Sequence, residues 1–233
     1  MQLKTWSHSR KAVFEQCKFR AKLQYIDKIP EPERPLPPGK TEHANDRGNR
    51  IHDAAETFVK DNIRLIDELK CFSEELHHLK QLYNTGIVSL EGEWAHDKNW
   101  EPCAWASETA WLRLKLDAFV RVNKTTAIVI DYKSGRMFGN EIKHAEQGQL
   151  YMCSAFVRYP ELETIVVEFW YTDQDDMTSV TYTRKQSEHF LRKFTKAGDE
   201  ITNCTEFPPN PNIFSCKWCP YGPKGTGHCT VGV

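Results

Sequence analysis

Two neighbouring stretches decide the fold, Lys115-Leu116-Asp117-Ala118-Phe119 and Ile128-Val129-Ile130-Asp131-Tyr132-Lys133. A polar turn that includes Asn123-Lys124-Thr125 lies between them, so the pattern predicts a β-hairpin or two neighbouring strands. Side chains two positions apart in a strand point to the same face. Asp131 and Lys133 can therefore share one site, close to the aspartate of the first stretch.

The residue types in these strands suit a hydrolytic metal centre. Carboxylate oxygens are the hard ligands that Mg²⁺ and Mn²⁺ prefer. A lysine beside such an ion can hold or deprotonate a water, or stabilise charge that builds on a phosphate. A plainer interpretation is that Asp131 opens a turn before Ser134-Gly135 and that Lys133 is an exposed strand residue.

Two flanking motifs extend the pattern. Gly48-Asn-Arg-Ile-His52 precedes the hairpin and Gln147-Gly-Gln-Leu-Tyr151 follows it. With Asp117 and Asp131-x-Lys133, the sequence resembles the PD-(D/E)XK nuclease superfamily. The G-x-x-x-H and Q-x-x-x-Y motifs are similar to those of its RecB-like branch. One departure is that the glycine common in the family two residues before the first aspartate is Lys115 here.

The resemblance implies an α/β fold in which helices flank a central mixed β-sheet, a restriction-endonuclease-like core. It also implies a set of site residues. Those implied in catalysis are Asp117, Asp131, Lys133, Gln147 and Tyr151. Those implied in binding Mg²⁺ or Mn²⁺ are His52, Asp117, Asp131 and the backbone carbonyl of Tyr132. Lys133 then orients or activates the attacking water, and the glutamine and tyrosine position the DNA strand.

The implied function is a Mg²⁺- or Mn²⁺-dependent deoxyribonuclease that hydrolyses phosphodiester bonds. We expect an exonuclease on single-stranded or end-containing DNA, in recombination, repair, or phage or CRISPR DNA processing. Three alternatives stay open: a non-catalytic nucleic-acid-binding module, a structural metal-cluster adaptor, and an endonuclease with the same chemistry. Because the aspartates and the lysine are all present, catalysis is favoured over the non-catalytic module.

The C-terminal cysteines predict a second metal centre. Cys216-x-x-Cys219 has a chelating spacing, and Cys229 adds a third thiolate. Since only one C-x-x-C is present, a four-cysteine zinc ribbon within the tail is excluded. In the AddB-type and CRISPR-associated RecB-like members that the chain resembles, one N-terminal and three C-terminal cysteines hold a 4Fe–4S cluster, and Cys17 matches the N-terminal one. All-thiolate ligation also suits zinc, and His228 leaves a Cys₃His zinc site open.

The nine residues between Cys219 and Cys229 form a longer gap than we expect for that family, which leaves the identity of the metal open. In either case the centre ties the two ends of the chain together. We expect one nuclease domain over residues 1–233, with residues 1–28 and 204–233 forming a cysteine-ligated metal cap. The other cysteines are expected to be packing residues: Cys71, Cys103, Cys153 and Cys204.

Composition fits a globular protein of ordinary type. The 233 residues are 39% hydrophobic and 27% charged, with a net charge of −1. The first residues lack the apolar segment of a secretion signal, and no run is long enough to span a membrane. We therefore expect a cytoplasmic or intracellular protein, of phage or prokaryotic type, that binds DNA and no membrane and forms no disulfides. The oligomeric state is left open.

Hydrophobic periodicity predicts the remaining elements. Helices are expected at residues 7–26, 41–61, 69–83, 144–158 and 185–203. Strands are expected at residues 87–95, 164–172 and 178–183, with a proline-rich connector at 29–40. Either Glu91 or Glu93 can face the site. Basic residues crowd the first and last helices, which predicts either solvated faces or a phosphate track.

Overall fold

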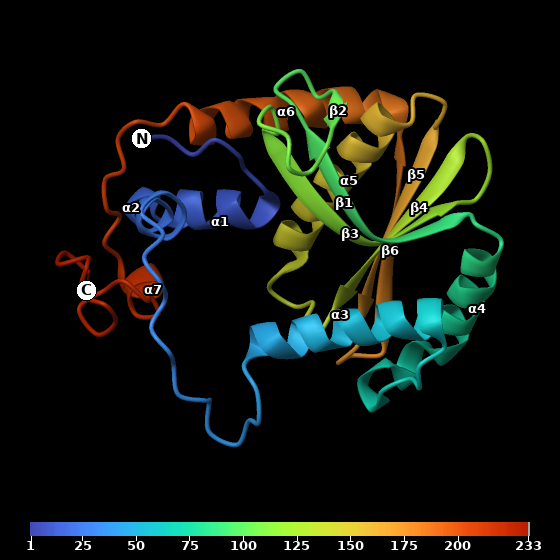
Figure 1. Ribbon diagram of the computed structural model, residues 1–233, viewed down its shortest axis with the longest axis horizontal. Helices are drawn as coiled ribbons and strands as arrows, with labels where there is room; N and C mark the ends of the chain where they lie inside the picture. The colour runs from blue at the N-terminus through green and yellow to red at the C-terminus, as the bar shows by residue number, and fades with distance from the viewer. Residues whose placement is uncertain (233) are drawn as a thin grey trace.

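The computed structural model describes residues 1–232 and contains a six-stranded mixed sheet in the order β2-β1-β3-β4-β5-β6 (Figure 1). Neighbouring strands pair antiparallel except β4 and β5, which pair in parallel. The strands are β1 Val88–His96, β2 Pro102–Cys103, β3 Leu112–Arg121, β4 Thr126–Lys133, β5 Thr164–Tyr171 and β6 Asp176–Thr183. The expected mixed α/β sheet and its central hairpin, β3–β4, are confirmed.

Helices cover both faces of this sheet (Figure 1). One layer contains α5 (Glu141–Arg158) and α6 (Arg184–Thr202), and the other contains α3 (Ala44–Asp61) and α4 (Ser73–Asn84). Each layer has its own apolar cluster. The α5–α6 side buries Trp6, Trp111, Phe119, Phe156 and Phe194, and the α3–α4 side buries Ile51, Leu69, Leu76 and Trp170. The removal of this apolar surface from water is the main force that holds the layers together.

The parallel pairing of β4 with β5 is a consequence of α5. Two parallel strands need a long crossover, and α5 with its loops spans the interval between them. Strand β4 lies inside the sheet with helices on both faces, so its residues 127–132 are nearly all buried. The end of β4 and the start of α5 are therefore fixed by a packed core on both sides.

The first helix differs from its prediction at Cys17. The expected continuous helix over residues 7–26 is wrong: α1 (His8–Gln16) ends at this cysteine, which has an extended backbone with φ −162°. The chain resumes as α2 (Lys18–Ala21) and a π-helical turn, η1 (Lys22–Ile26). The spacing of apolar residues in this segment could not reveal the break, because Phe14 and Ala21 are buried on either side of it.

Other departures concern short elements. The helix expected at 69–83 begins as a 3₁₀ segment, η2 (Asp67–Phe72), before α4. The two-residue strand β2 and the one-turn helix α7 (Ile213–Cys216) were not predicted, because neither is long enough to show a period. Within the described residues, no helix is both long and apolar enough to cross a membrane.

The two ends of the chain lie on the same side of the molecule (Figure 1). The backbone N–H of Asn210 approaches Cys17 Sγ at 3.5 Å, and its side-chain amide donates to the Gln16 carbonyl at 3.1 Å. The Tyr221 hydroxyl donates to the Ile29 carbonyl at 3.0 Å. The C-terminal tail therefore packs against the break between α1 and α2.

Candidate functional site

The site forms where pairing between β3 and β4 stops. Their ladder runs from Arg121 opposite Ala127 to Ala118 opposite Ile130, and it does not continue to Asp117 and Asp131. The backbone N–H of Tyr132 instead donates to Asp117 Oδ2 at 2.6 Å. The buried carboxylate thus replaces a backbone partner at the point where the strands separate.

Helix α3 brings His52 to this point. Its Nδ1 hydrogen-bonds Asp117 Oδ1 at 2.9 Å. A Cβ at Gly48, one turn earlier, would lie 3.3 Å from Ser134 Oγ, so the glycine allows α3 to approach the end of β4 closely. Burial alone would lower the pKa of His52, but the hydrogen bond and charge of Asp117 outweigh it and raise this pKa to about 9. The imidazole is therefore protonated at neutral pH in the metal-free protein.

Strand β1 contributes Glu91. Its neighbours Leu90 and Gly92 pair with Ala118 and Leu116, which places Glu91 across from Asp117. The ligand atoms of this glutamate, His52 and the aspartate all lie within 4.8 Å of one another. The structure thus selects Glu91 over Glu93, the other residue left open by the sequence.

The backbone at Glu91 explains why the sequence could not make that choice. Glu91 has φ +46°, in the left-handed region that residues other than glycine rarely adopt. This conformation interrupts the simple alternation of the strand. Glu93, in contrast, is exposed and lies 3.6 Å from Lys115 Nζ. Strained backbone of this kind is concentrated at functional sites.

The carboxylates of the site crowd one another. Burial, and then the charge of Asp131, raise the pKa of Asp117 above its ordinary value, although His52 opposes this. Burial and the charge of Asp117 likewise raise the pKa of Glu91. A divalent cation relieves such crowding. The carboxylate oxygens suit Mg²⁺ or Mn²⁺, and the imidazole favours Mn²⁺ over Mg²⁺. Asp131 Oδ2 is buried and has no contact of this kind other than its ion pair with Lys133, so this oxygen can serve as a further metal ligand.

Helix α5 supplies the other half of the site. Asp131 Oδ1 accepts hydrogen bonds from the Tyr151 hydroxyl at 2.7 Å and from Gln147 Nε2 at 3.1 Å. Lys133 Nζ donates to Gln147 Oε1 at 3.0 Å and pairs with Asp131 Oδ2. Because burial and the nearby aspartates raise the pKa of Tyr151, its hydroxyl stays a neutral donor. This network fixes the lysine and the aspartate relative to one another.

The structure therefore brings the predicted active-site residues to one place. His52 contacts one carboxylate, and the residues of α5 contact the other. Tyr132 is the exception in detail, since the contact observed for it is made by its N–H and not by the carbonyl predicted as a ligand. Its side chain packs on the α3–α4 side of the sheet, edge-on to Trp170 and to the ring of His52.

A family model described as the PD-(D/E)XK nuclease superfamily matches residues 5–223. The chain belongs to this superfamily. The match spans the hairpin, both flanking motifs and part of the cysteine tail. Membership of this superfamily implies a metal-dependent nuclease.

Solved structures similar to this nuclease share little sequence with it. "Crystal structure of SSO0001" is 14% identical, with a TM-score of 0.49, and the match covers 100% of this chain and 89% of that one. A phage related exonuclease from Haemophilus somnus 129PT is 12% identical, with a TM-score of 0.33, and covers 86% and 94%. Both scores are below 0.5, so neither similarity carries weight here. No curated protein matches the sequence.

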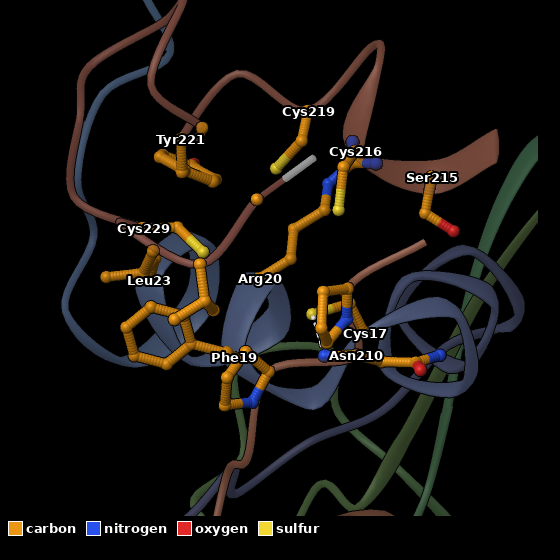
Figure 2. Close-up of a pocket in the computed structure, with 15 residues that line it drawn as sticks. Cys17, Phe19, Arg20, Leu23, Asn210, Ser215, Cys216, Cys219, Tyr221 and Cys229 are labelled. Atoms are coloured by element: carbon orange, nitrogen blue, oxygen red, sulfur yellow. Dashed lines mark hydrogen bonds between the residues drawn. The ribbon is translucent and has the colours of Figure 1, made fainter. Parts of the chain in front are cut away.

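One pocket is lined by the four cysteines that are predicted to bind the second metal (Figure 2). They are Cys17, Cys216, Cys219 and Cys229. Two of their sulfurs accept backbone N–H groups, from Asn210 to Cys17 at 3.5 Å and from Asn212 to Cys216 at 3.4 Å. His228 is not among the lining residues and instead hydrogen-bonds Thr226, so the Cys₃His alternative is not supported.

The cysteine sulfurs are not gathered around a single point. Within residues 1–232, the group of three or more His, Cys, Asp or Glu whose ligand atoms lie within 4.8 Å of one another is His52, Glu91 and Asp117. Sulfurs around one tetrahedral zinc stand only about 3.8 Å apart for bonds of about 2.3 Å. The cysteines are thus neighbours in one pocket without forming a preassembled metal site, and the 4Fe–4S assignment stays a prediction.

The remaining cysteines differ in burial. Cys153 is fully buried, as expected of a packing residue, whereas Cys71, Cys103 and Cys204 are half-buried. Three tryptophans near the sheet, Trp94, Trp100 and Trp111, are also buried. These residues therefore belong mainly to the core.

Metal binding is expected to release a proton from His52. Because its pKa is about 9 in the metal-free protein, the imidazole must lose a proton before its nitrogen can bind an ion. Mn²⁺ affinity should rise by up to about tenfold per pH unit between pH 7 and 9 and then level off. Titration calorimetry in buffers of different ionisation enthalpy measures the protons released. The same release from His52→Gln as from the wild type would show that this histidine is not the source.

Proposed function

We propose that this nuclease hydrolyses DNA phosphodiester bonds with Mg²⁺ or Mn²⁺, as an exonuclease on single-stranded or end-containing DNA. The observation that carries the proposal is the hydrogen-bonded set of Asp131, Lys133, Gln147 and Tyr151 beside the group of His52, Glu91 and Asp117. Together these residues place anionic metal ligands beside a fixed lysine cation. Both kinds of group assist the hydrolysis of a phosphodiester.

We assign a role to each of these residues from its contacts. His52, Glu91, Asp117 and Asp131 hold the divalent ion, and the Tyr132 carbonyl is the further ligand that the family resemblance implies. The ion, when bound, polarises the phosphate and makes a water more acidic. Lys133 orients the attacking water and stabilises charge at the phosphate. Gln147 fixes the lysine, so its amine does not have to be reoriented during the reaction.

The two flanking motifs support placement in the RecB-like branch. In the G-x-x-x-H motif, Gly48 permits the close approach of α3 and His52 reaches the carboxylate. In the Q-x-x-x-Y motif, Gln147 and Tyr151 stand one helical turn apart and both contact Asp131. The residues of each motif thus make contacts that help to build this site.

The preference for free DNA ends is proposed from the proline-rich connector. Residues 27–43 leave the π-helical turn and loop outward as an extended segment before α3 begins (Figure 1). Prolines stiffen such a segment, and His43 Nε2 lies 3.1 Å from the Arg34 carbonyl across it. We propose that this segment and α5 narrow the entrance to the site, so that a strand has to thread in from its end.

Closed circular DNA tests this proposal. With Mn²⁺, the enzyme is expected to degrade a linear single strand and to leave a covalently closed single-stranded circle of the same sequence intact. The linear strand is the matched control for the circle, because the two differ only in whether the strand has ends. Rapid cleavage of the closed circle would show an endonuclease with the same chemistry. No cleavage of either substrate would favour a non-catalytic DNA-binding module or a structural adaptor.

We also propose that residues 1–28 and 204–233 form a cap on the nuclease domain, closed by a 4Fe–4S cluster on Cys17, Cys216, Cys219 and Cys229. Their shared pocket and the N–H groups directed at two sulfurs support this, since such hydrogen bonds tune iron–sulfur clusters. All-thiolate ligation also suits Zn²⁺, which is the alternative. Thiolate ligands also agree with the intracellular location that the sequence leads us to expect.

Serine substitutions test the cap. Anaerobically purified protein is expected to be brown, and replacing any one of the four cysteines by serine should bleach it and lower its melting temperature, because the centre contributes folding free energy. Cys71→Ser, which alters a half-buried cysteine outside the pocket, should do neither. Colourless protein with one zinc per chain would overturn the cluster. Metal-free protein with an unchanged melting temperature would overturn the cap itself.

A further inference from the structure

The loop that joins β4 to α5 exposes an aromatic side chain close to the catalytic strand. Phe138 is 85% exposed, although it follows Lys133 by only five residues and precedes the helix that carries Gln147. Ile142, in the first turn of α5, is 88% exposed. Neither side chain contributes to a core, so their apolar surface faces solvent.

This loop is held in place from both sides. Arg47 Nη1 of α3 donates to the Ser134 carbonyl at 2.8 Å. The Met137 N–H donates to Gln174 Oε1 at 2.6 Å, and the Met137 side chain packs against the α5–α6 core. Phe138 therefore projects from an anchored backbone and loses little freedom when a ligand covers it.

The number of residues between Lys133 and Phe138 limits the distance between these two residues. Five residues span at most about 18 Å, so the Cα of Phe138 lies within that distance of the Cα of Lys133. Successive bases along one strand of a duplex are about 3.4 Å apart. A strand whose phosphate lies at the lysine thus has its nearest bases within reach of the phenylalanine.

The charge around the tip suits a polyanion. Arg136 and Lys143 flank Phe138 in sequence, and the charge of Lys143 adds to that of Lys133 at the neighbouring His144. Glu141 is the one acidic side chain between them, and its carboxylate is occupied by the Gly139 N–H at 2.8 Å. An exposed aromatic ring between cationic side chains is how proteins bind single strands without sequence preference: the cations track phosphates and the ring stacks on a base.

We propose that Phe138 is a stacking platform for a nucleobase of the single strand, a few nucleotides from the cleaved bond. This rests on the proposed function, because it requires DNA in the active site. Its role is to hold the strand in register for Lys133 and Asp131. Loss of the ring should weaken strand binding, with the catalytic groups left in place.

Binding of a labelled single strand with Ca²⁺ in place of Mn²⁺ tests the platform. Phe138→Ala is expected to raise the Kd by about 5- to 100-fold, the range for loss of one base–aromatic stack, and Phe138→Trp should restore it. Phe214→Ala is the matched control, because Phe214 is 83% exposed but lies in α7, far along the chain, and it should bind as the wild type does. Photo-crosslinking from 5-iododeoxyuridine, placed at successive positions, should map to Phe138.

An unchanged Kd for Phe138→Ala, or an equal loss in Phe214→Ala, overturns the platform. If the wild type still cleaves the strand with Mn²⁺ in that case, only the platform fails and the nuclease proposal stands. If the wild type neither binds nor cleaves the strand, both fail. Since Phe138 is exposed, the alanine variant should keep its fold, and an unchanged melting temperature checks this.

Discussion

Replacing Lys133 by alanine is expected to lower the single-turnover rate of DNA cleavage by about 10²- to 10⁴-fold, the usual effect of losing an acid–base group. Lys133 Nζ is held by Gln147 and pairs with Asp131, so the substitution removes the cation and leaves the metal-binding carboxylates in place. Mn²⁺ affinity and DNA binding should stay nearly unchanged. Rates and binding constants are measured on the same labelled strand.

Lys124→Ala is the matched control for this experiment. Lys124 is an exposed lysine in the turn at the opposite end of the same hairpin, so its loss changes the net charge equally without touching the site. It should cleave at the wild-type rate. If Lys133→Ala also cleaves at the wild-type rate, the interpretation of the D-x-K motif is wrong and the catalytic lysine lies elsewhere.

Replacing Asp117 by asparagine is expected to abolish cleavage and to weaken Mn²⁺ binding. The asparagine retains an oxygen that can accept the Tyr132 N–H, but it removes a negative ligand from the group with His52 and Glu91. DNA binding should survive and can strengthen, because one negative charge near the phosphates is gone. Calorimetry and gel shifts measure the two affinities separately.

The stability of Asp117→Asn distinguishes loss of chemistry from loss of fold. The pKa of Asp117 is raised in the folded protein, so at neutral pH its ionised form is less favourable there than in the unfolded chain. Its removal relieves this cost but also removes the partner that raises the pKa of His52. The two effects oppose each other, so the melting temperature of the metal-free protein should change little. A large drop in melting temperature would mean that the inactivity reflects misfolding.

The sequence predicts the central part of this fold well because its signals are local. The apolar segments around Asp117 and Asp131 are long enough to define strands, and their spacing defines the hairpin. The pairs Gly48–His52 and Gln147–Tyr151 stand one helical turn apart, so a helix directs each pair to the same side. Their distance to the strands could not be read from the sequence.

Features that depend on tertiary contacts were not predictable. The left-handed backbone at Glu91 interrupts a strand pattern that otherwise leaves two glutamates equivalent. The break at Cys17 is covered by the C-terminal tail, which is almost 200 residues away in sequence. The basic residues of the first helix were predicted to form a solvated face or a phosphate track, but Lys11 is buried and pairs with Glu15 and Glu146.

We propose above all that Asp131 and its neighbours form a metal-dependent nuclease site. The most direct test is the single-turnover cleavage of an end-labelled DNA strand by wild-type protein and Asp131→Asn, each with Mn²⁺ and with EDTA. We expect cleavage by the wild type with Mn²⁺ alone, and none by the variant under either condition. Equal cleavage by both proteins, or cleavage by the wild type in EDTA, would contradict it.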